Sequence, residues 1–165
     1  MNFYLAVERV MGRIAALLLV LTGAFLTFEV VARYFFTRPT IWAAELSQLC
    51  LIWAVPIAMA WVLSTGRHIR VTALTALAPA PVRRGMELAS LLVILAFSVI
   101  VTVYGHDIFA DSLERGRTSG TMLNLKAWVP EAAVPAGFAL LALSSVVNMW
   151  RVLHGDMPAP ERPAE

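Results

Sequence analysis

The sequence predicts an all-α integral membrane protein with four transmembrane helices. Hydrophobic residues make up 59% of the 165 residues and charged residues only 15%, whereas soluble domains contain about 25% charged residues. The mean hydropathy is +0.74, and four apolar runs each approach the length of about 20 residues that crosses a bilayer. The net charge of +2 is too small to indicate a nucleic-acid-binding protein.

The four predicted spans cover residues 14–36, 42–64, 86–104 and 131–153. Arg9 and Arg13 precede the first span, which runs on without a small-residue cleavage pattern, so we expect it to be retained rather than cleaved as a signal peptide. Pro130 suits the first turn of the last span, where its missing N–H costs little. We therefore treat residues 1–155 as a single membrane domain and residues 156–165 as a flexible C-terminal tail.

The distribution of basic residues predicts the orientation of the spans. With four spans, eight of the 13 Lys and Arg residues fall in the N-terminal segment, the second loop and the C-terminal tail, and five fall on the other side. Cytoplasmic loops carry the excess of positive charge, so both termini are expected in the cytoplasm. Arg67, His68 and Arg70 would then anchor the end of the second span at the cytoplasmic interface.

Two segments are expected to lie outside the hydrocarbon. Residues 69–77 carry apolar side chains on one helical face and predict a short interfacial helix in the cytoplasmic loop, with an ordinary loop as the alternative. On the opposite side, the third span is expected to continue as a periplasmic helical extension that stops near Gly116. Its apolar face requires a cover, supplied either by residues 122–128 or by a partner protein.

Two charged residues of the first span are predicted to pair. Glu29 precedes Arg33 by four residues, which places both side chains on one helical face in the favourable order for an ion pair. A charge in hydrocarbon is costly, so mutual neutralisation near the interface is the structural interpretation. The functional alternative is a proton relay through Glu29.

The second span carries a polar stripe at its start. Glu45 lies in the first turn, where the helix dipole stabilises a carboxylate. Gln48 and Pro56 continue the same face, and the proline frees a backbone carbonyl one turn earlier. Such a stripe faces protein more often than lipid. Glu45 is therefore expected to pair either with Arg33 or Arg38 across the short loop, or with a donor on another chain.

No motif for catalysis or cofactor binding is visible. The single cysteine, Cys50, excludes a disulfide framework and a thiolate metal site. The three histidines, at positions 68, 106 and 154, do not form a bis-histidine haem pair. Hydrolase and phosphate-binding signatures are missing as well. The sequence therefore predicts a protein that is not an enzyme and has no cofactor of its own.

The region 33–71 resembles the small membrane subunit of tripartite ATP-independent periplasmic (TRAP) transporters. The likeness is carried by Arg33-Tyr34-Phe35-Phe36, Ile41-Trp42-Ala43-Ala44-Glu45-Leu46, the central Trp53, and Gly66-Arg67-His68-Ile69-Arg70-Val71. Ala44 and Thr72 replace two acidic residues of the family pattern, so no role of those acids carries over to this chain.

The resemblance implies a bacterial inner-membrane subunit of a sodium-driven importer of organic acids, such as C4-dicarboxylates or sialic acid. Its partners would be a large membrane subunit, which would hold the sodium, and a periplasmic substrate-binding protein. Glu45, Gln48, Trp53 and Pro56 are then the candidate contacts with the large subunit. Candidate contacts with the binding protein lie between residues 104 and 128, at Asp107, Asp111, Arg115 and Arg117.

Two functions thus remain open from the sequence. The first is a non-catalytic scaffold that stabilises the large subunit and helps to dock the binding protein. The second is a self-sufficient small proton-coupled transporter that uses Glu29 and Glu45 as carriers.

Overall fold

The described residues form four long helices and one single-turn helix. The computed structural model describes residues 2–37, 40–64, 79–118, 120 and 124–154. The elements are α1 (Asn2–Phe35), α2 (Ile41–Ser64), α4 (Ala80–Glu114), α5 (Trp128–Glu131) and α6 (Ala133–Leu153). Four segments are long and apolar enough to cross a membrane, namely Arg9–Phe35, Trp42–Leu63, Pro81–Glu114 and Trp128–Leu153.

This architecture confirms the predicted all-α fold with four spans. The predicted interfacial helix at residues 69–77 and the tail at residues 156–165 lie outside the described residues. The third span belongs to a helix that begins at Ala80 and continues to Glu114. At 35 residues, α4 is about 50 Å long, whereas the hydrocarbon core is about 30 Å thick. One or both ends of α4 therefore extend beyond the hydrocarbon unless the helix is strongly tilted.

The ends of α4 follow from proline and glycine chemistry. Pro79 adopts an extended backbone at the N-cap, and a second proline occupies the first turn, where an N–H would have no helical acceptor. At the other end, Gly116 adopts the left-handed conformation with φ +59°. The N–H of Gly116 donates to the Leu113 carbonyl, and the N–H of Arg117 donates to the Ser112 carbonyl. This paired arrangement is the Schellman motif that commonly ends helices at glycine.

A proline also explains the division between α5 and α6. Pro135 has no N–H to donate to the Glu131 carbonyl, which lies four residues earlier. The chain makes a turn at Ala132, while hydrogen bonds from Ala132 to Trp128 and from Ala136 to Ala132 keep the two segments in one helical path. The last span therefore starts at Trp128 and passes through a local break.

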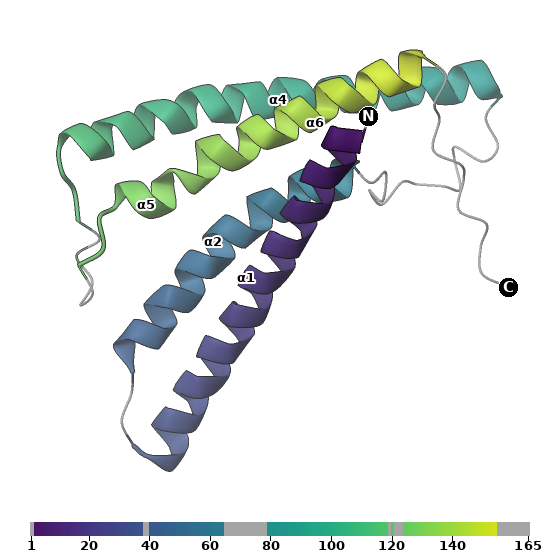
Figure 1. The fold of residues 1–165 in the computed structure, drawn as a ribbon. Coiled ribbons are helices and arrows are strands. Elements are labelled where there is room, and N and C mark those ends of the chain that lie inside the picture. Colours follow the sequence, from purple (N-terminus) through teal and green to yellow (C-terminus); the bar gives the residue numbers. More distant parts are fainter. Residues whose placement is uncertain (1, 38–39, 65–78, 119, 121–123, 155–165) are drawn as a thin grey trace, which may run out of the picture.

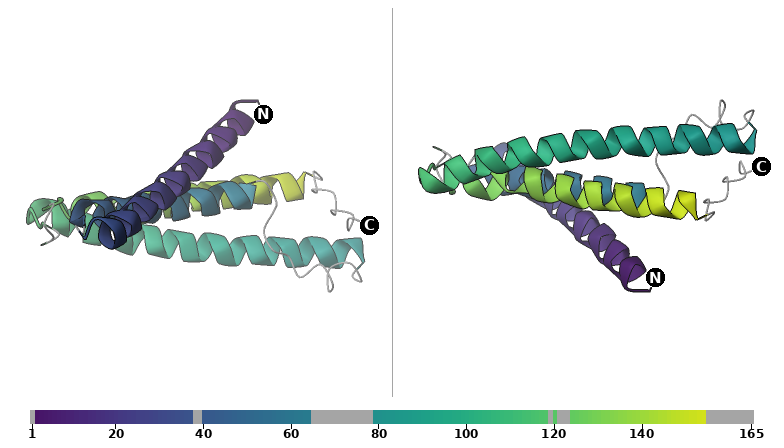
Figure 2. Two further views of the ribbon diagram at one scale, coloured as in Figure 1. Left: turned by 90° about the horizontal axis from the view of Figure 1, so that it is seen from below. Right: turned by 90° about the horizontal axis from the view of Figure 1, so that it is seen from above.

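The helices pack as two hairpins that share one contact surface. α1 packs along α2, α4 packs along α6, and α2 packs against α6. Figure 1 shows the two hairpins diverging toward the loops that close them, at residues 36–40 and 115–127. Figure 2 shows α4 and α6 side by side, with α1 inclined to both and its N-terminal end pointing away.

Small residues fill the contact between α1 and α2. On α1, Ala15, Thr22 and Glu29 are buried at seven-residue intervals, and on α2, Ala43 and Ala54 are fully buried. Small side chains let helix backbones approach closely in a membrane. Near the N-terminus of α1 and the C-terminus of α2, the indole of Trp61 occupies the space beside Gly12. A Cβ added to Gly12 would lie 2.7 Å from the ring.

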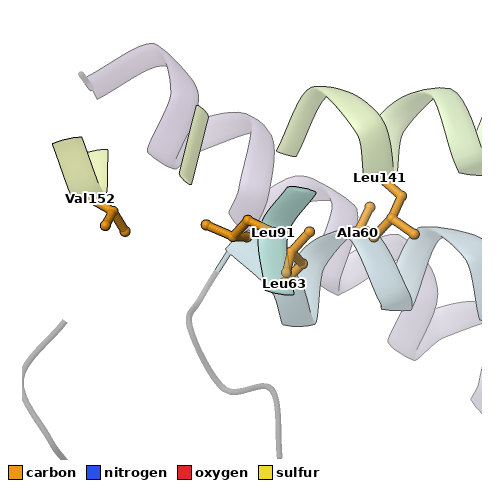
Figure 3. Close-up of a cluster of buried hydrophobic side chains, with 5 residues drawn as sticks. All are labelled: Ala60, Leu63, Leu91, Leu141 and Val152. Carbon is orange, nitrogen blue, oxygen red and sulfur yellow. The ribbon is translucent and has the colours of Figure 1, made fainter. Parts of the chain in front are cut away.

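The apolar core lies where the two hairpins meet. It consists of Ala60 and Leu63 from α2, Leu91 from α4, and Leu141 and Val152 from α6 (Figure 3). Met11 of α1 packs against this cluster.

Hydroxyl groups within the spans are mostly satisfied inside their own helices. The Oγ atoms of Thr22, Ser98, Thr102 and Ser145 each donate to the carbonyl four residues earlier, at 2.7 to 3.0 Å. This local bond removes the cost of an unsatisfied polar group in hydrocarbon. These residues therefore serve packing and do not form a polar pathway.

Candidate subunit interface

Most of the membrane-facing surface is not covered by the chain itself. In the most apolar window of each span, the buried share ranges from 11% in the third span to 28% in the fourth. Large apolar side chains such as Val20, Val93 and Leu143 are exposed on α1, α4 and α6. An apolar surface of this extent faces either lipid or the helices of another protein.

The polar stripe of α2 divides into exposed and covered residues. Gln48 is exposed two turns into the helix, within the candidate span Trp42–Leu63. Glu45 and Trp53 are half-buried, and Glu45 takes part in an interaction within the chain. Both expectations for the partner of Glu45 stay predictions.

Pro56 lies against this chain's own last span. A Cβ added to Gly137 of α6 would lie 2.0 Å from the Pro56 Cβ and 3.2 Å from its Cα. Only glycine permits so close an approach of α2 and α6. Glu45 precedes Pro56 by eleven residues, or about three turns, and so projects from the same side of α2.

Glu29 and Arg33 form an ion pair within α1. Nη2 of Arg33 donates to Oε1 of Glu29. The Glu29 side chain is 11% exposed, whereas the Arg33 side chain is 58% exposed. The carboxylate therefore sits among packed side chains while the guanidinium reaches out of the packed surface, an arrangement that neutralises the buried charge.

The charged residues at the C-terminal end of α4 gather around one carboxylate. Oδ1 of Asp111 lies 2.5 Å from Nε of Arg115, and Oδ2 lies 2.8 Å from Nη2 of Arg117. A bridge between Thr118 and Lys126 and a 2.9 Å hydrogen bond from the Ala127 N–H to the Arg117 carbonyl continue the structure. The loop between α4 and α5 is thus fastened to the end of α4.

This Asp111 cluster, formed by Asp111, Arg115 and Arg117, brings together three of the four residues predicted to contact a periplasmic protein. Asp107, the fourth, is exposed one turn earlier on α4. Aromatic packing supports the same end of the molecule, because the rings of Phe109 and Trp128 meet edge to face with centroids 6.4 Å apart. The predicted cytoplasmic anchor, formed by Arg67, His68 and Arg70, lies outside the described residues.

One pocket in the described part of the chain lies between α1 and α2 and is apolar. It measures about 230 Å³ and is lined only by apolar side chains, from Leu19, Ala54, Val55, Ala58, Met59 and Val62. Among the described residues, no three His, Cys, Asp or Glu side chains are close enough to hold a metal ion. The pocket offers no group that could bind a carboxylate.

Two contacts that join the hairpins were missed in the sequence. Nδ2 of Asn148 on α6 donates to the Leu63 carbonyl in the last turn of α2, at 3.0 Å. An amide within an apolar helix could have drawn attention to Asn148. The contact of Gly137 with Pro56 joins residues that are far apart in sequence, so spacing along the chain does not reveal it.

Comparison with known proteins agrees with these features. Residues 23–155 match the family described as "Tripartite ATP-independent periplasmic transporters, DctQ component". The chain is also 26% identical, over 157 residues, to the "C4-dicarboxylate TRAP transporter small permease protein DctQ" of Vibrio cholerae serotype O1. That alignment covers 80% of this chain and 66% of the relative, so the chain spans slightly less than two thirds of the relative's length.

The match confirms the predicted resemblance and fits the four apolar helices. DctQ proteins are transport components, which also confirms the prediction that this chain is not an enzyme. The chain therefore belongs to the DctQ component family of tripartite ATP-independent periplasmic transporters and is a multi-pass protein of the inner membrane.

Proposed function

We propose that this chain is the scaffold subunit of a sodium-driven, binding-protein-dependent importer of organic acids. In this assembly it stabilises the large membrane subunit and helps to position the periplasmic binding protein. The family match supports membership of a three-part system. The observation that carries the scaffold role is the exposed surface of the spans, and in particular the exposed Gln48 of α2.

Gln48 is unusual because its amide is exposed on a helix that otherwise suits lipid. The helix that contains it has a mean hydropathy of 1.9 in its most apolar window. An amide that faces hydrocarbon without a partner is unfavourable, and interhelical hydrogen bonds of such groups are worth roughly 0.6 kcal/mol on average in membranes. A polar group on a helix of the large subunit would satisfy Gln48.

The Asp111 cluster supports the docking role. It holds the loop between α4 and α5 against the helix end and leaves Arg115 and Arg117 more than half exposed. A rigid, charged surface can attract and orient a soluble protein, with strong dependence on ionic strength. We expect the binding protein to meet this surface and the neighbouring Asp107.

The name of the relative suggests the substrate class, and the geometry of this chain suggests which subunit binds the substrate and the sodium. C4-dicarboxylates are the first compounds to test, because the relative from Vibrio cholerae carries that substrate in its name, and sialic acids are the second. Among the described residues, no three His, Cys, Asp or Glu side chains could hold a metal ion, and the pocket between α1 and α2 is apolar. We therefore place the sodium and substrate sites in the large subunit.

The self-sufficient transporter is the less favoured alternative. A proton relay requires a carboxylate that can exchange protons with an aqueous path. Glu29 is instead buried and held by Arg33, and the pocket beside α2 is apolar.

We also propose that both termini face the cytoplasm, because eight of the 13 basic residues then lie on that side. The test uses single cysteines at the exposed Thr118 and His154 in a Cys50→Ser background. A membrane-impermeant maleimide added to intact spheroplasts should label the cysteine at 118 and not the one at 154. The reverse pattern would overturn the orientation.

The scaffold role is tested by co-expressing the tagged chain with a large TRAP subunit and measuring co-purification in mild detergent. We expect a stable complex whose yield falls for Gln48→Ala. The matched control is Val20→Ala, which truncates an exposed apolar side chain on α1 and removes no polar group, so it should lower the yield less than Gln48→Ala. Absence of a complex with wild-type chain, or equal loss for both variants, would contradict the proposed interface.

A further inference from the structure

Two buried polar side-chain atoms near the contact between α4 and α5 have no hydrogen-bond partner among the described residues. One is Oγ of Ser112, a residue that is 0% exposed. The other is Oε2 of Glu131, which is buried although the residue as a whole is half-buried. Elsewhere on α4, the hydroxyls of Ser98 and Thr102 donate to carbonyls of their own helix. A buried polar atom without a partner is costly, so these two atoms require an explanation.

Ser112 lies on the face of α4 that meets the last span. Two contacts define this face: the ring of Phe109 meets Trp128 edge to face, and a Cβ added to Gly105 would lie 3.4 Å from Cδ of Pro135. Ser112 follows Phe109 by three residues and Gly105 by seven, so it shares their side of the helix. Its hydroxyl is therefore directed toward α5, which lies beside this end of α4 (Figure 1).

Glu131 lies on the opposing face of the last span. It follows Trp128 by three residues and precedes Pro135 by four, and both of those residues touch α4. Hydrogen bonds from Ala132 to Trp128 and from Ala136 to Ala132 keep this segment in one helical path. Glu131 is therefore centred on the side that faces α4.

The direction of the two side chains brings the hydroxyl and the carboxylate together. The two helices run antiparallel, because the later of the two α4 residues meets the earlier residue of the last span. Ser112 and Glu131 thus lie about one turn apart along the contact. Helical side chains lean toward the N-terminus of their own helix, so Ser112 leans toward the level of Glu131 and Glu131 leans toward the level of Ser112. Both polar groups converge on one space between α4 and α5.

The carboxylate of Glu131 lacks a balancing charge within the described part of the chain. Glu131 belongs to the candidate span Trp128–Leu153. The ion pairs at this end of the molecule join Asp111 to Arg115 and Arg117, and no pair seen among the described residues includes Glu131. In surroundings of low dielectric, a carboxylate is accompanied by an opposite charge or a metal ion. Carboxylate and water oxygens are ligands that suit hard cations.

We propose that Ser112 and Glu131 form a binding site for a small monovalent cation, Na⁺ or K⁺, between α4 and α5. The carboxylate supplies the single negative charge that balances such an ion, the hydroxyl oxygen is a second ligand, and water completes the coordination. A divalent ion would keep a net positive charge here. The bound cation fastens α5 to the end of α4. The site is structural, separate from the sodium sites that drive transport, and independent of the proposed function.

The test measures amide hydrogen exchange by mass spectrometry on the full-length chain in nanodiscs of zwitterionic lipid. Samples contain NaCl, KCl or choline chloride at equal ionic strength and pH, because choline is too large for the site. We expect slower exchange for residues 124–134 in NaCl or KCl than in choline chloride. Binding to the closed state alone slows exchange by the factor 1 + [cation]/Kd, about tenfold at a concentration ten times Kd.

Three variants assign this effect to the site. Glu131→Gln keeps the shape of the side chain but removes its charge, and should abolish the difference between the salts. Ser112→Ala removes the second ligand and should reduce the difference. Glu114→Gln is the matched control, because it removes an exposed carboxylate at the end of α4, and it should preserve the difference.

Three results would overturn the cation site. The first is equal exchange of wild-type residues 124–134 in all three salts, which would indicate that water alone joins the two groups. The second is a difference between the salts that persists in Glu131→Gln. The third is its loss in Glu114→Gln, which would indicate general screening of charge. The wild-type comparison requires no variant, so poor folding of a variant still leaves a decisive measurement.

Discussion

Replacing Gly137 by alanine should destabilise the contact between the two hairpins. The added Cβ would lie 2.0 Å from the Cβ of Pro56, whereas ordinary contacts begin near 3.4 Å. The neighbouring atoms belong to the backbone and ring of Pro56, so no flexible side chain can move aside. α2 and α6 must therefore separate by roughly 1 Å or more, and overpacking of this kind typically costs about 1–3 kcal/mol.

The separation should also weaken contacts further along the same two helices. The hydrogen bond between Asn148 and Leu63 has a length of 3.0 Å, and a shift of the helices would lengthen it beyond normal geometry. Leu63 and Leu141 would lose part of their packing in the shared core. The expected result is a loss of stability larger than the cost of one side-chain clash.

The free energy of unfolding can be measured by SDS titration in mixed micelles, with tryptophan fluorescence as the readout. Gly23→Ala is the matched control, because an added Cβ there meets nothing within 4 Å. It should be neutral or slightly stabilising, since alanine favours helix over glycine by about 1 kcal/mol in water. Equal free energies of unfolding for Gly137→Ala and Gly23→Ala would refute the close approach of α2 and α6.

Three further changes test other contacts. Asn148→Ala should lower the free energy of unfolding by roughly 0.6 kcal/mol, the average for such bonds in membranes, because the Leu63 carbonyl loses its donor; an unchanged value in the same titration would contradict the bond. Glu29→Gln should lower stability, since Arg33 loses its partner, yet preserve transport by the complete system; lost proton coupling would favour the relay instead. Asp111→Asn should speed amide exchange in the loop after α4, and unchanged exchange would show that the ion cluster does not hold that loop.

Local features of the fold could be predicted because they depend on residues close in sequence. The hydropathy of each apolar run predicts a span, since a helix satisfies its own backbone groups in lipid. The pairing of Glu29 with Arg33 follows from the four-residue spacing on one helix. The end of α4 near Gly116 follows from the freedom of glycine to adopt a positive φ.

Contacts between distant segments could not be predicted in the same way. Small-residue spacing marks Gly137 as a point of close approach but does not identify Pro56 as its partner. The stripe of α2 indicated that Pro56 faces protein, but not that the protein is this chain's own α6. The Asp111 cluster depends on the fold of the loop, and the divergence of the hairpins depends on all three helix contacts together.

The most direct test of the proposed scaffold role is transport in proteoliposomes from which one component at a time is omitted. With an inward sodium gradient, labelled C4-dicarboxylate should accumulate only when this chain, the large membrane subunit and the loaded binding protein are all present. This chain alone should give no uptake above empty liposomes. Uptake driven by this chain alone, abolished by Glu29→Gln or Glu45→Gln, would contradict the account.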